Sequence, residues 1–267
     1  MTCDPLGQRL RHIHERLCGL DSLAPCPPVN ALFSELVTLC STSRGDRVLD
    51  CPQIRAIMPS LHRLCGEGEY ELEREWALRV IDSGFPVREL ARFPYYDNYR
   101  KLVDLEVHAL FGLGYTRLRS AAFIGSGPLP LSAILLANRF GLAVDSIDRK
   151  PEAHALAVKA TDRLGLGAAL RFHRADLLEF SSLKEFEIVF LAALVGADRA
   201  EKRRIVRHLA AHMRPGALLV VRTAHQLRSL LYPHIRLEDL SGFAAKLVLH
   251  PLNEVINSVI VTECTGG

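Results

Sequence analysis

The pattern of hydrophobic residues changes near residue 118, and this change restricts the possible folds more than any other feature. Seven short β-branched or apolar runs follow it: "SAAFIG", "LAVDSID", "LRFHRAD", "FEIVFLAAL", "GALLVVRT", "AKLVLH" and "NSVIVTE". Helical stretches such as 131–140, 151–164 and 199–213 separate the first five, which predicts a parallel sheet covered on both faces. Only "PLNEVI" separates the last two, so we expect them to pair antiparallel.

The first part of the chain has the periodicity of helices. Up to about residue 113 apolar residues recur at helical spacing, and "VNALFSELVTLC" places five on one face: Leu32, Phe33, Leu36, Val37 and Cys40. Few strand patterns occur there. We therefore predict a bundle of five or six helices at residues 1–117 and a Rossmann-like α/β domain at residues 118–267.

The composition is that of an ordinary globular protein, with 49% hydrophobic and 24% charged residues. Since the net charge is only +3 and no lysine-arginine tract occurs, we expect no nucleic-acid partner. No run approaches about eighteen apolar residues, so we expect no membrane partner. The seven cysteines are scattered without a C-x-x-C pair, which argues against a disulfide framework or structural zinc site. Reduced thiols in a cytoplasmic protein are the better interpretation.

Three features at the ends of successive strands predict a nucleotide-type ligand. Gly125 and Gly127 follow the first strand in "FIGSGPLPLS" and let the backbone approach a ligand. Asp148 ends the second strand, 21 residues after Gly127, a spacing suited to a carboxylate that binds ribose hydroxyls. Asp176 ends the third strand, where nucleotide-binding transferases usually contact adenine. Singly, each could be a plain turn or a helix cap.

The prolines of the same loop indicate which nucleotide. A dinucleotide-binding loop usually has a third glycine near Pro130, whereas here Pro128 and Pro130 flank Leu129. Pro128 removes an N–H donor that a pyrophosphate would need. S-adenosylmethionine (SAM) has no phosphate and carries a positive sulfonium, so it loses little. Five parallel strands and an antiparallel hairpin are also typical of SAM-dependent transferases rather than of nicotinamide dehydrogenases.

Six stretches resemble nicotianamine synthases, especially those of plants. They are "VNALFSELV" (29–37), "RFPYYDNYRKLVDLE" (92–106), "FIGSGPLPLS" (123–132), "FLAALVG" (190–196), "VVRTAHQLRSLLYP" (220–233) and "HPLNEVINSVIV" (250–261). The resemblance implies transfer of the 3-amino-3-carboxypropyl group of SAM to an amine, with release of methylthioadenosine, to build a nicotianamine-type metallophore. Shorter bacterial relatives load one such unit onto histidine.

The resemblance also implies roles for individual residues. Glu73 would be the base that accepts the amine proton, and Tyr99 would hydrogen-bond the reacting arm, which requires the helical half to close over the sheet. The implied SAM contacts are Gly125, Ser126, Gly127, Pro128, Asp148, Asp176, Ala192 and Leu194. The implied substrate contacts are Tyr95, Asn98, Arg222, His225 and Tyr232, and Asn257 belongs to a matching motif.

Simpler interpretations of these residues stay open. Glu73 lies among other glutamates that could form a solvated helix face, and the tyrosines could be core aromatics. Arg222 could clamp a substrate carboxylate or serve as a structural ion-pair partner. The plant pattern has glycine where Gln226 stands and histidine where Glu75 stands, so the acceptor and the number of transfers stay open.

Three functions therefore compete. The favoured one is aminocarboxypropyl transfer, with SAM-derived units or histidine as acceptor; the others are a conventional methyltransferase and a binding module without catalysis. We find no metal-ligand cluster, and amine attack on a sulfonium needs no Lewis acid. We expect SAM and other small molecules as partners, and a homodimer is the assembly we consider.

Overall fold

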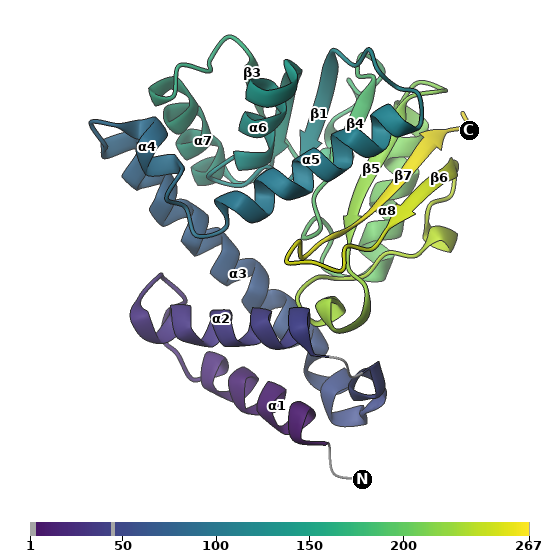
Figure 1. Ribbon diagram of the computed structural model, residues 1–267. Helices are drawn as coiled ribbons and strands as arrows, with labels where there is room; N and C mark the ends of the chain where they lie inside the picture. Colours follow the sequence, from purple (N-terminus) through teal and green to yellow (C-terminus); the bar gives the residue numbers. More distant parts are fainter. Residues whose placement is uncertain (1–3, 44–45, 267) are drawn as a thin grey trace.

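The computed structural model describes residues 4–43 and 46–266, and its centre is one sheet in the order β3-β2-β1-β4-β5-β7-β6 (Figure 1). Strands β1 to β5 are parallel, whereas β7 pairs antiparallel with both β5 and β6. The predicted parallel sheet and terminal antiparallel hairpin are confirmed. The strands are β1 Ser120–Ile124, β2 Ala143–Asp148, β3 Leu170–Arg174, β4 Ile188–Leu191, β5 Leu218–Thr223, β6 Phe243–Leu249 and β7 Ser258–Cys264.

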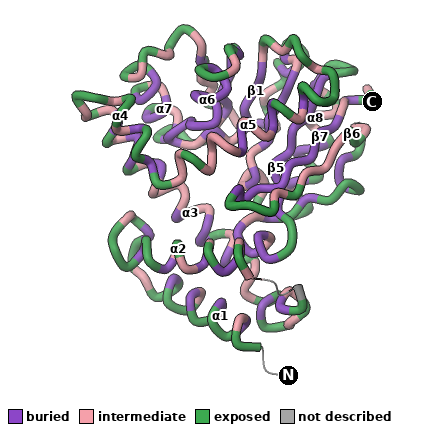
Figure 2. Tube along the Cα trace, in the orientation of Figure 1, coloured by how far each residue is buried: buried purple, intermediate pink, exposed green. Residues whose placement is uncertain are grey.

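Helices cover both faces of the sheet, and this explains why its central strands are continuous apolar runs. One layer contains α5, α6 and α7, and the other contains α8. In β4, Ile188 and Phe190 pack in the first layer, whereas Val189 and Leu191 pack in the second. Strands β1, β2, β4, β5 and β7 are accordingly buried along most of their length, whereas the edge strands β3 and β6 are mostly half-buried or exposed (Figure 2). The helices are α5 Tyr96–Gly112, α6 Leu131–Phe140, α7 Pro151–Arg163 and α8 Arg199–His212.

The N-terminal part is helical, as predicted. Proline occupies the first turn of α1, α2, α3 and α4, where its missing N–H leaves no hydrogen bond unmade. The longest helix, α3, has 31 residues and extends from the α1–α2 pair to α7 beside the sheet (Figure 1). The elements are α1 Pro5–Cys18, α2 Pro27–Thr42, α3 Pro52–Asp82 and α4 Pro86–Leu90, with a short 3-10 helix η1 at Asp46–Asp50.

The apolar core continues across the predicted domain boundary at residue 118. Trp76 of α3 and Leu102 of α5 belong to the same buried cluster as Phe123 of β1 and Leu131 of α6. The far end of α3 packs instead with α1 and α2 in a separate cluster. The division into 1–117 and 118–267 stays a prediction.

Two expectations from the sequence, on membrane-spanning segments and on reduced thiols, can be compared with the structure. In the described ranges no helix combines the length and the apolar character needed to cross a membrane. Cys51 is disulfide-bonded, so the expectation of reduced thiols is wrong at this residue. The cytoplasmic location stays a prediction. Among the described residues, which leave out Cys3, the free cysteines are Cys18, Cys26, Cys40, Cys65 and Cys264.

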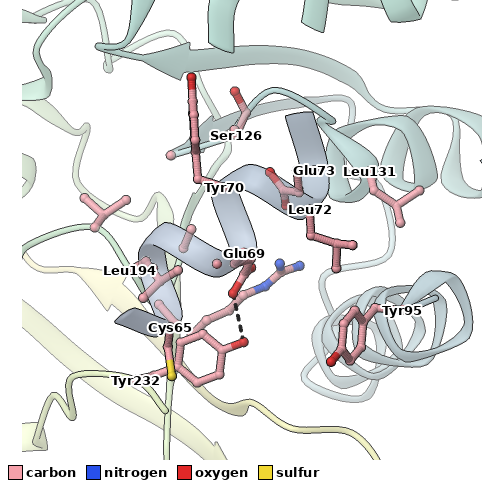
Figure 3. Close-up of a pocket in the computed structure, with 18 of the residues that line it drawn as sticks. Cys65, Glu69, Tyr70, Leu72, Glu73, Tyr95, Ser126, Leu131, Leu194 and Tyr232 are labelled. Carbon is pink, nitrogen blue, oxygen red and sulfur yellow. Dashed lines mark hydrogen bonds between the residues drawn. The ribbon is translucent and has the colours of Figure 1, made fainter. Parts of the chain in front are cut away.

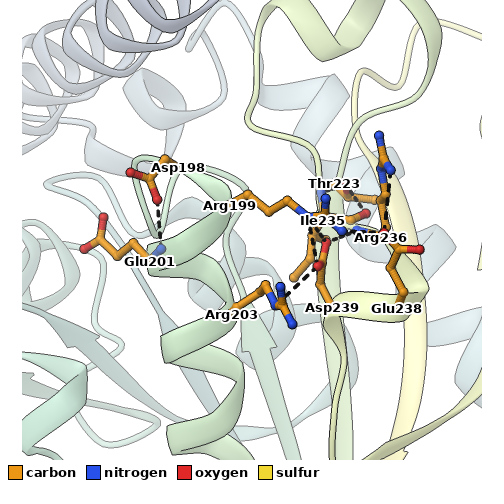
Figure 4. A network of polar contacts seen from close by, with 9 residues as sticks. All are labelled: Asp198, Arg199, Glu201, Arg203, Thr223, Ile235, Arg236, Glu238 and Asp239. Carbon is orange, nitrogen blue, oxygen red and sulfur yellow. Dashed lines mark hydrogen bonds and ion pairs between the residues drawn. The ribbon is translucent and has the colours of Figure 1, made fainter.

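A polar network holds the connection between β5 and β6 against α8 (Figure 4). Asp239 is buried at the end of the 3-10 helix η4 (Leu237–Asp239) and accepts a hydrogen bond from Arg199 Nε at 2.9 Å. The same carboxylate accepts the backbone N–H of Arg236 at 3.1 Å. A buried carboxylate with several donors is held firmly. This connection also carries Tyr232, which lies in the site described next.

Candidate active site

The sheet and the helical half enclose a cavity of about 840 Å³ at the carboxyl ends of the parallel strands. Its wall comes from α2, α3, the start of α5 and the segments that follow β1 to β5. Open α/β sheets bind their ligands at this edge. The predicted site residues that line the cavity are Glu73, Tyr95, Asn98, Tyr99, Gly125, Ser126, Gly127, Asp148, Asp176, Ala192, Leu194, Arg222 and Tyr232.

Two predicted contacts do not line the cavity. Pro128 is buried behind its wall, and Pro130 faces the cavity in its place. His225 is exposed and stacks on His250 with 4.0 Å between ring centroids. His225 lies just beyond β5 with its imidazole at the surface. It is therefore not placed to contact a substrate in the cavity.

Glu69 and Glu73 lie one helical turn apart on α3 and point into the cavity (Figure 3). The hydroxyl of Tyr99 on α5 lies 2.8 Å from Glu69 Oε1 and 3.1 Å from Glu73 Oε1. Tyr232 donates to the other oxygen of Glu69 at 3.1 Å. The helical half and the segment after β5 therefore meet in one cluster of two carboxyls and two phenols.

Burial shifts the proton affinities of this cluster. The pKa of Glu73 is raised well above its ordinary value, first by burial and then by the negative charge of Glu69. Burial also raises the pKa of Glu69, although hydrogen bonds from Tyr99 and Tyr232 act in the opposite direction. The pKa of Tyr99 is raised well above its ordinary value by burial, so its hydroxyl keeps its proton. A carboxyl with a raised pKa is suited to accept a proton near neutral pH.

The glycine loop after β1 directs its N–H groups at carboxylates. Gly127 donates to Asp148 Oδ2 at 3.0 Å, and the backbone N–H of Leu129 donates to Glu73. Gly127 has φ +68°, and a Cβ atom there would lie 2.1 Å from Glu73 Oε2. Only glycine therefore allows Glu73 its observed position at this turn.

The two strand-end aspartates occupy the wall beside this loop. Asp148 accepts N–H groups from Gly127 and Lys150, each at 3.0 Å, and so connects the loops after β1 and β2. Asp176 Oδ1 caps the short 3-10 helix η2 (Leu177–Glu179) by accepting from Leu178 at 2.9 Å. Each carboxylate keeps acceptor capacity for a ligand, because a carboxylate has about four lone-pair sites.

The segment after β4 forms another part of the wall through Ala192 and Leu194. Lys202 of α8 is buried beneath it and donates to the carbonyl oxygens of Ala193 and Val195 at 2.7 and 2.8 Å. Burial lowers the pKa of Lys202 to about 8. The ammonium thus fixes the backbone of this segment from outside the cavity.

Arg222 is committed to the protein itself. Its guanidinium makes a two-point ion pair with Glu106 of α5, at 2.8 and 2.9 Å, and donates to Ser132 of α6 at 2.8 Å. All three side chains are buried. Of the two interpretations open from the sequence, these contacts favour the structural ion pair.

Asn257 and Glu69 are functional candidates that sequence reasoning did not place in the site. Asn257 is 8% exposed, lines the cavity, and its amide nitrogen has no hydrogen-bond partner among the described residues. A buried, unpaired amide in a cavity wall is suited to bind a ligand oxygen. The signal for Glu69 was its spacing of one turn from Glu73.

A metal centre finds no support in the described part of the chain. Within residues 4–43 and 46–266, no three or more histidine, cysteine, aspartate or glutamate side chains are grouped so as to hold a metal ion.

A family model described as "Nicotianamine synthase protein" matches residues 3–266. The chain belongs to the nicotianamine synthase family. Nicotianamine synthase 2 of Oryza sativa subsp. japonica is 42% identical over 97% of this chain and 82% of that protein. Probable nicotianamine synthase 4 of Arabidopsis thaliana is 38% identical over 98% of this chain and 84% of that protein. The resemblance read from the sequence motifs is confirmed.

Solved structures extend the likeness of this nicotianamine synthase family member to the whole fold. A glutamate-to-glutamine variant of MtNAS in complex with S-adenosylmethionine has a TM-score of 0.85 and 26% identity, covering 99% of this chain and 100% of that chain. MtNAS in complex with MTA and tNA has a TM-score of 0.88 and 26% identity, covering 98% and 99%. The predicted Rossmann-like transferase fold with an N-terminal helical part is confirmed.

Proposed function

We propose that this chain transfers the 3-amino-3-carboxypropyl group of SAM to an amine, releases methylthioadenosine and so builds a nicotianamine-type metallophore. The observation that carries the proposal is the meeting of Glu73 and Tyr99, from separate helices, against the Gly127 loop inside the cavity. Membership of the nicotianamine synthase family supports it.

The charge of the cavity suits this donor. The part of its wall beside the glycine loop carries the carboxyls of Glu73 and Asp148, and the loop N–H groups that would hold a phosphate donate to these two. Carboxylates at this point of the wall favour a cationic group of the ligand. The sulfonium of SAM is such a cation, whereas a pyrophosphate would be repelled.

The acceptor must lose a proton before it attacks. An α-amino group has an ordinary pKa of about 7.7–8.0 and is mostly protonated at neutral pH. Glu73 takes this proton, the nitrogen lone pair forms the bond to the carbon beside sulfur, and the C–S electron pair stays on sulfur. Methylthioadenosine leaves as a neutral thioether. The raised pKa of Glu73 brings its proton affinity toward that of the amine.

The remaining cavity residues bind and orient the reactants in this proposal. Asp148 accepts hydrogen bonds from the ribose and Asp176 faces the adenine, each with lone pairs that the protein leaves free. The closure of α2, α3 and α5 over the sheet excludes water from the sulfonium. The phenols of Tyr95 and Tyr232 contact the amino-acid part of donor or acceptor.

Mass spectrometry of the coproduct decides between the candidate reactions. Purified protein with SAM alone should release methylthioadenosine and form SAM-derived oligomers. Consumption of added histidine, with no product from SAM alone, would establish single transfer onto histidine instead. Release of S-adenosylhomocysteine would identify a methyltransferase and end the proposal.

Substitution of the base tests the residue assignment. Glu73→Gln should lower the rate of methylthioadenosine release roughly 10²–10⁴-fold, the usual effect of losing a general base. Glu67→Gln is the matched control, because Glu67 lies on the same helix, is exposed and pairs with Arg63. Equal rates for both variants would remove Glu73 from the mechanism.

A further inference from the structure

The cluster of Glu69, Glu73, Tyr99 and Tyr232 lacks one of the protons that its hydrogen bonds require if both glutamates are charged. Tyr99 has a single hydroxyl proton, yet its oxygen lies within hydrogen-bonding distance of a carboxyl oxygen on each of Glu69 and Glu73. With both carboxyls ionised, one of these contacts would oppose lone pairs. A second proton on one carboxyl satisfies both contacts at once.

Three donors beside the cluster are already engaged and do not supply this proton. Tyr232 donates to Glu69 Oε2, and the backbone N–H of Leu129 serves Glu73. Arg222 is the cation whose charge acts on Glu69, but its guanidinium holds Glu106 in a two-point ion pair. The charged and titratable groups that face the pair are Cys65, Tyr95, Tyr99, Asp148, Arg222 and Tyr232.

We infer that Glu69 and Glu73 share one proton through the Tyr99 hydroxyl, and that Glu69 is a positioning residue which sets the basicity of Glu73. In the resting protein Glu73 donates to the Tyr99 oxygen and Tyr99 donates to Glu69. Above the pKa of the pair this proton passes to solvent water. Glu73 is then a carboxylate beside a second negative charge and binds the amine proton more tightly than an isolated glutamate would. The inference rests on the proposed function for the identity of the amine.

The geometry sets the size of the effect. Because both carboxyl oxygens contact the same hydroxyl oxygen, at 2.8 and 3.1 Å, they are at most 5.9 Å apart. Two unit charges at this separation, with an effective dielectric constant of about 20, shift a pKa by about two units. The Glu69 charge can therefore raise the pKa of Glu73 from the range of an ordinary carboxyl toward that of the amine.

The first test is the pH profile of kcat/KM for methylthioadenosine release in Glu69→Gln. Loss of the neighbouring charge should move the acidic limb of the profile to lower pH by about one to two units. The plateau should fall less than in Glu73→Gln, because a weaker base is still present. Glu67→Gln should keep the limb of the wild type. A Glu69→Gln profile that keeps the wild-type limb would overturn the inference, since a purely structural role changes the rate without moving the limb.

The second test needs no turnover. Infrared spectra of the purified wild-type protein near neutral pH should contain a protonated-carboxyl band that is lost in Glu69→Gln and in Glu73→Gln alike, because either change ends the sharing. A wild-type spectrum without the band would overturn the inference even if the proposed reaction is found. If no methylthioadenosine is formed, the proposed function fails. The infrared spectra still show whether Glu69 and Glu73 share a proton.

Discussion

The variant Gly127→Ala tests whether the close contact between the glycine loop and Glu73 matters for catalysis beyond the effect of backbone strain. The substitution adds one methyl group at φ +68°, and that methyl would lie 2.1 Å from Glu73 Oε2. Real Cβ contacts essentially never fall below 3.0 Å, so the carboxyl oxygen must retreat by about 1 Å. The movement is away from the loop and so away from the N–H of Leu129.

Two effects of different size should follow. An alanine with left-handed backbone costs roughly 1–2 kcal/mol in the free energy of unfolding. A misplacement of about 1 Å in a catalytic group can cost about 10²-fold in rate, which corresponds to about 2.7 kcal/mol in the activation barrier. We expect Gly127→Ala to remain folded and to lose about 10²-fold in kcat for methylthioadenosine release.

Gly141→Ala is a matched control. Gly141 caps α6 at the same φ of +68°, and a Cβ atom there would meet no other atom within 4 Å. Urea denaturation should show similar losses of stability in both variants, whereas only Gly127→Ala should lose kcat. Turnover that falls equally in both would refute the reasoning, because strain alone would then explain the effect.

Three further substitutions test the surroundings of the cavity. Glu106→Gln should lower the free energy of unfolding in urea by about 3–5 kcal/mol, because it leaves the buried guanidinium of Arg222 without a carboxylate; an unchanged value would contradict this. Asn257→Leu should raise KM about tenfold without loss of stability, since it removes an amide that has no protein partner among the described residues; destabilisation with unchanged KM would show a structural role. Lys202 has a pKa of about 8 against an ordinary 10.5, so the unfolded chain binds more protons between these pH values and wild-type stability contains a component that rises with pH there. Lys202→Met should lack this rise in urea denaturation from pH 8 to 10.5, and identical slopes would contradict the assignment.

The fold was predictable because its signals are local. All the strands but β3 are short, mainly apolar or β-branched runs, and the period changes from helical to extended near residue 118. The connection of six residues between the last two runs required an antiparallel pair, as β6 and β7 show. The continuity of the core from α3 into the sheet has no local signal, because it depends on which helix faces meet after folding.

The site was predictable only in part, and Glu69 shows why. Several glutamates follow one another at residues 67 to 75, and nothing in their order says which face of α3 is covered. Glu69 is covered by Tyr99 from α5 and by Tyr232 from the segment after β5, and both tyrosines are distant from Glu69 in the sequence. Glu73 was named through family motifs, and the same motifs named His225, which stacks on His250 and does not line the cavity.

The two prolines of the glycine loop can be understood from the donors that remain. With Pro128 and Pro130 in place, Leu129 supplies the N–H between them, and it donates to Glu73. Gly127 donates to Asp148, so the loop donates to carboxylates where a dinucleotide-binding loop would donate to phosphate. Each N–H group directed at a carboxyl group favours the charged form of that group. In a dehydrogenase the N–H groups of this turn would bind an anion, whereas here they bind carboxyl groups, which favour a cationic ligand. The prolines also reduce the number of N–H donors available to a phosphate.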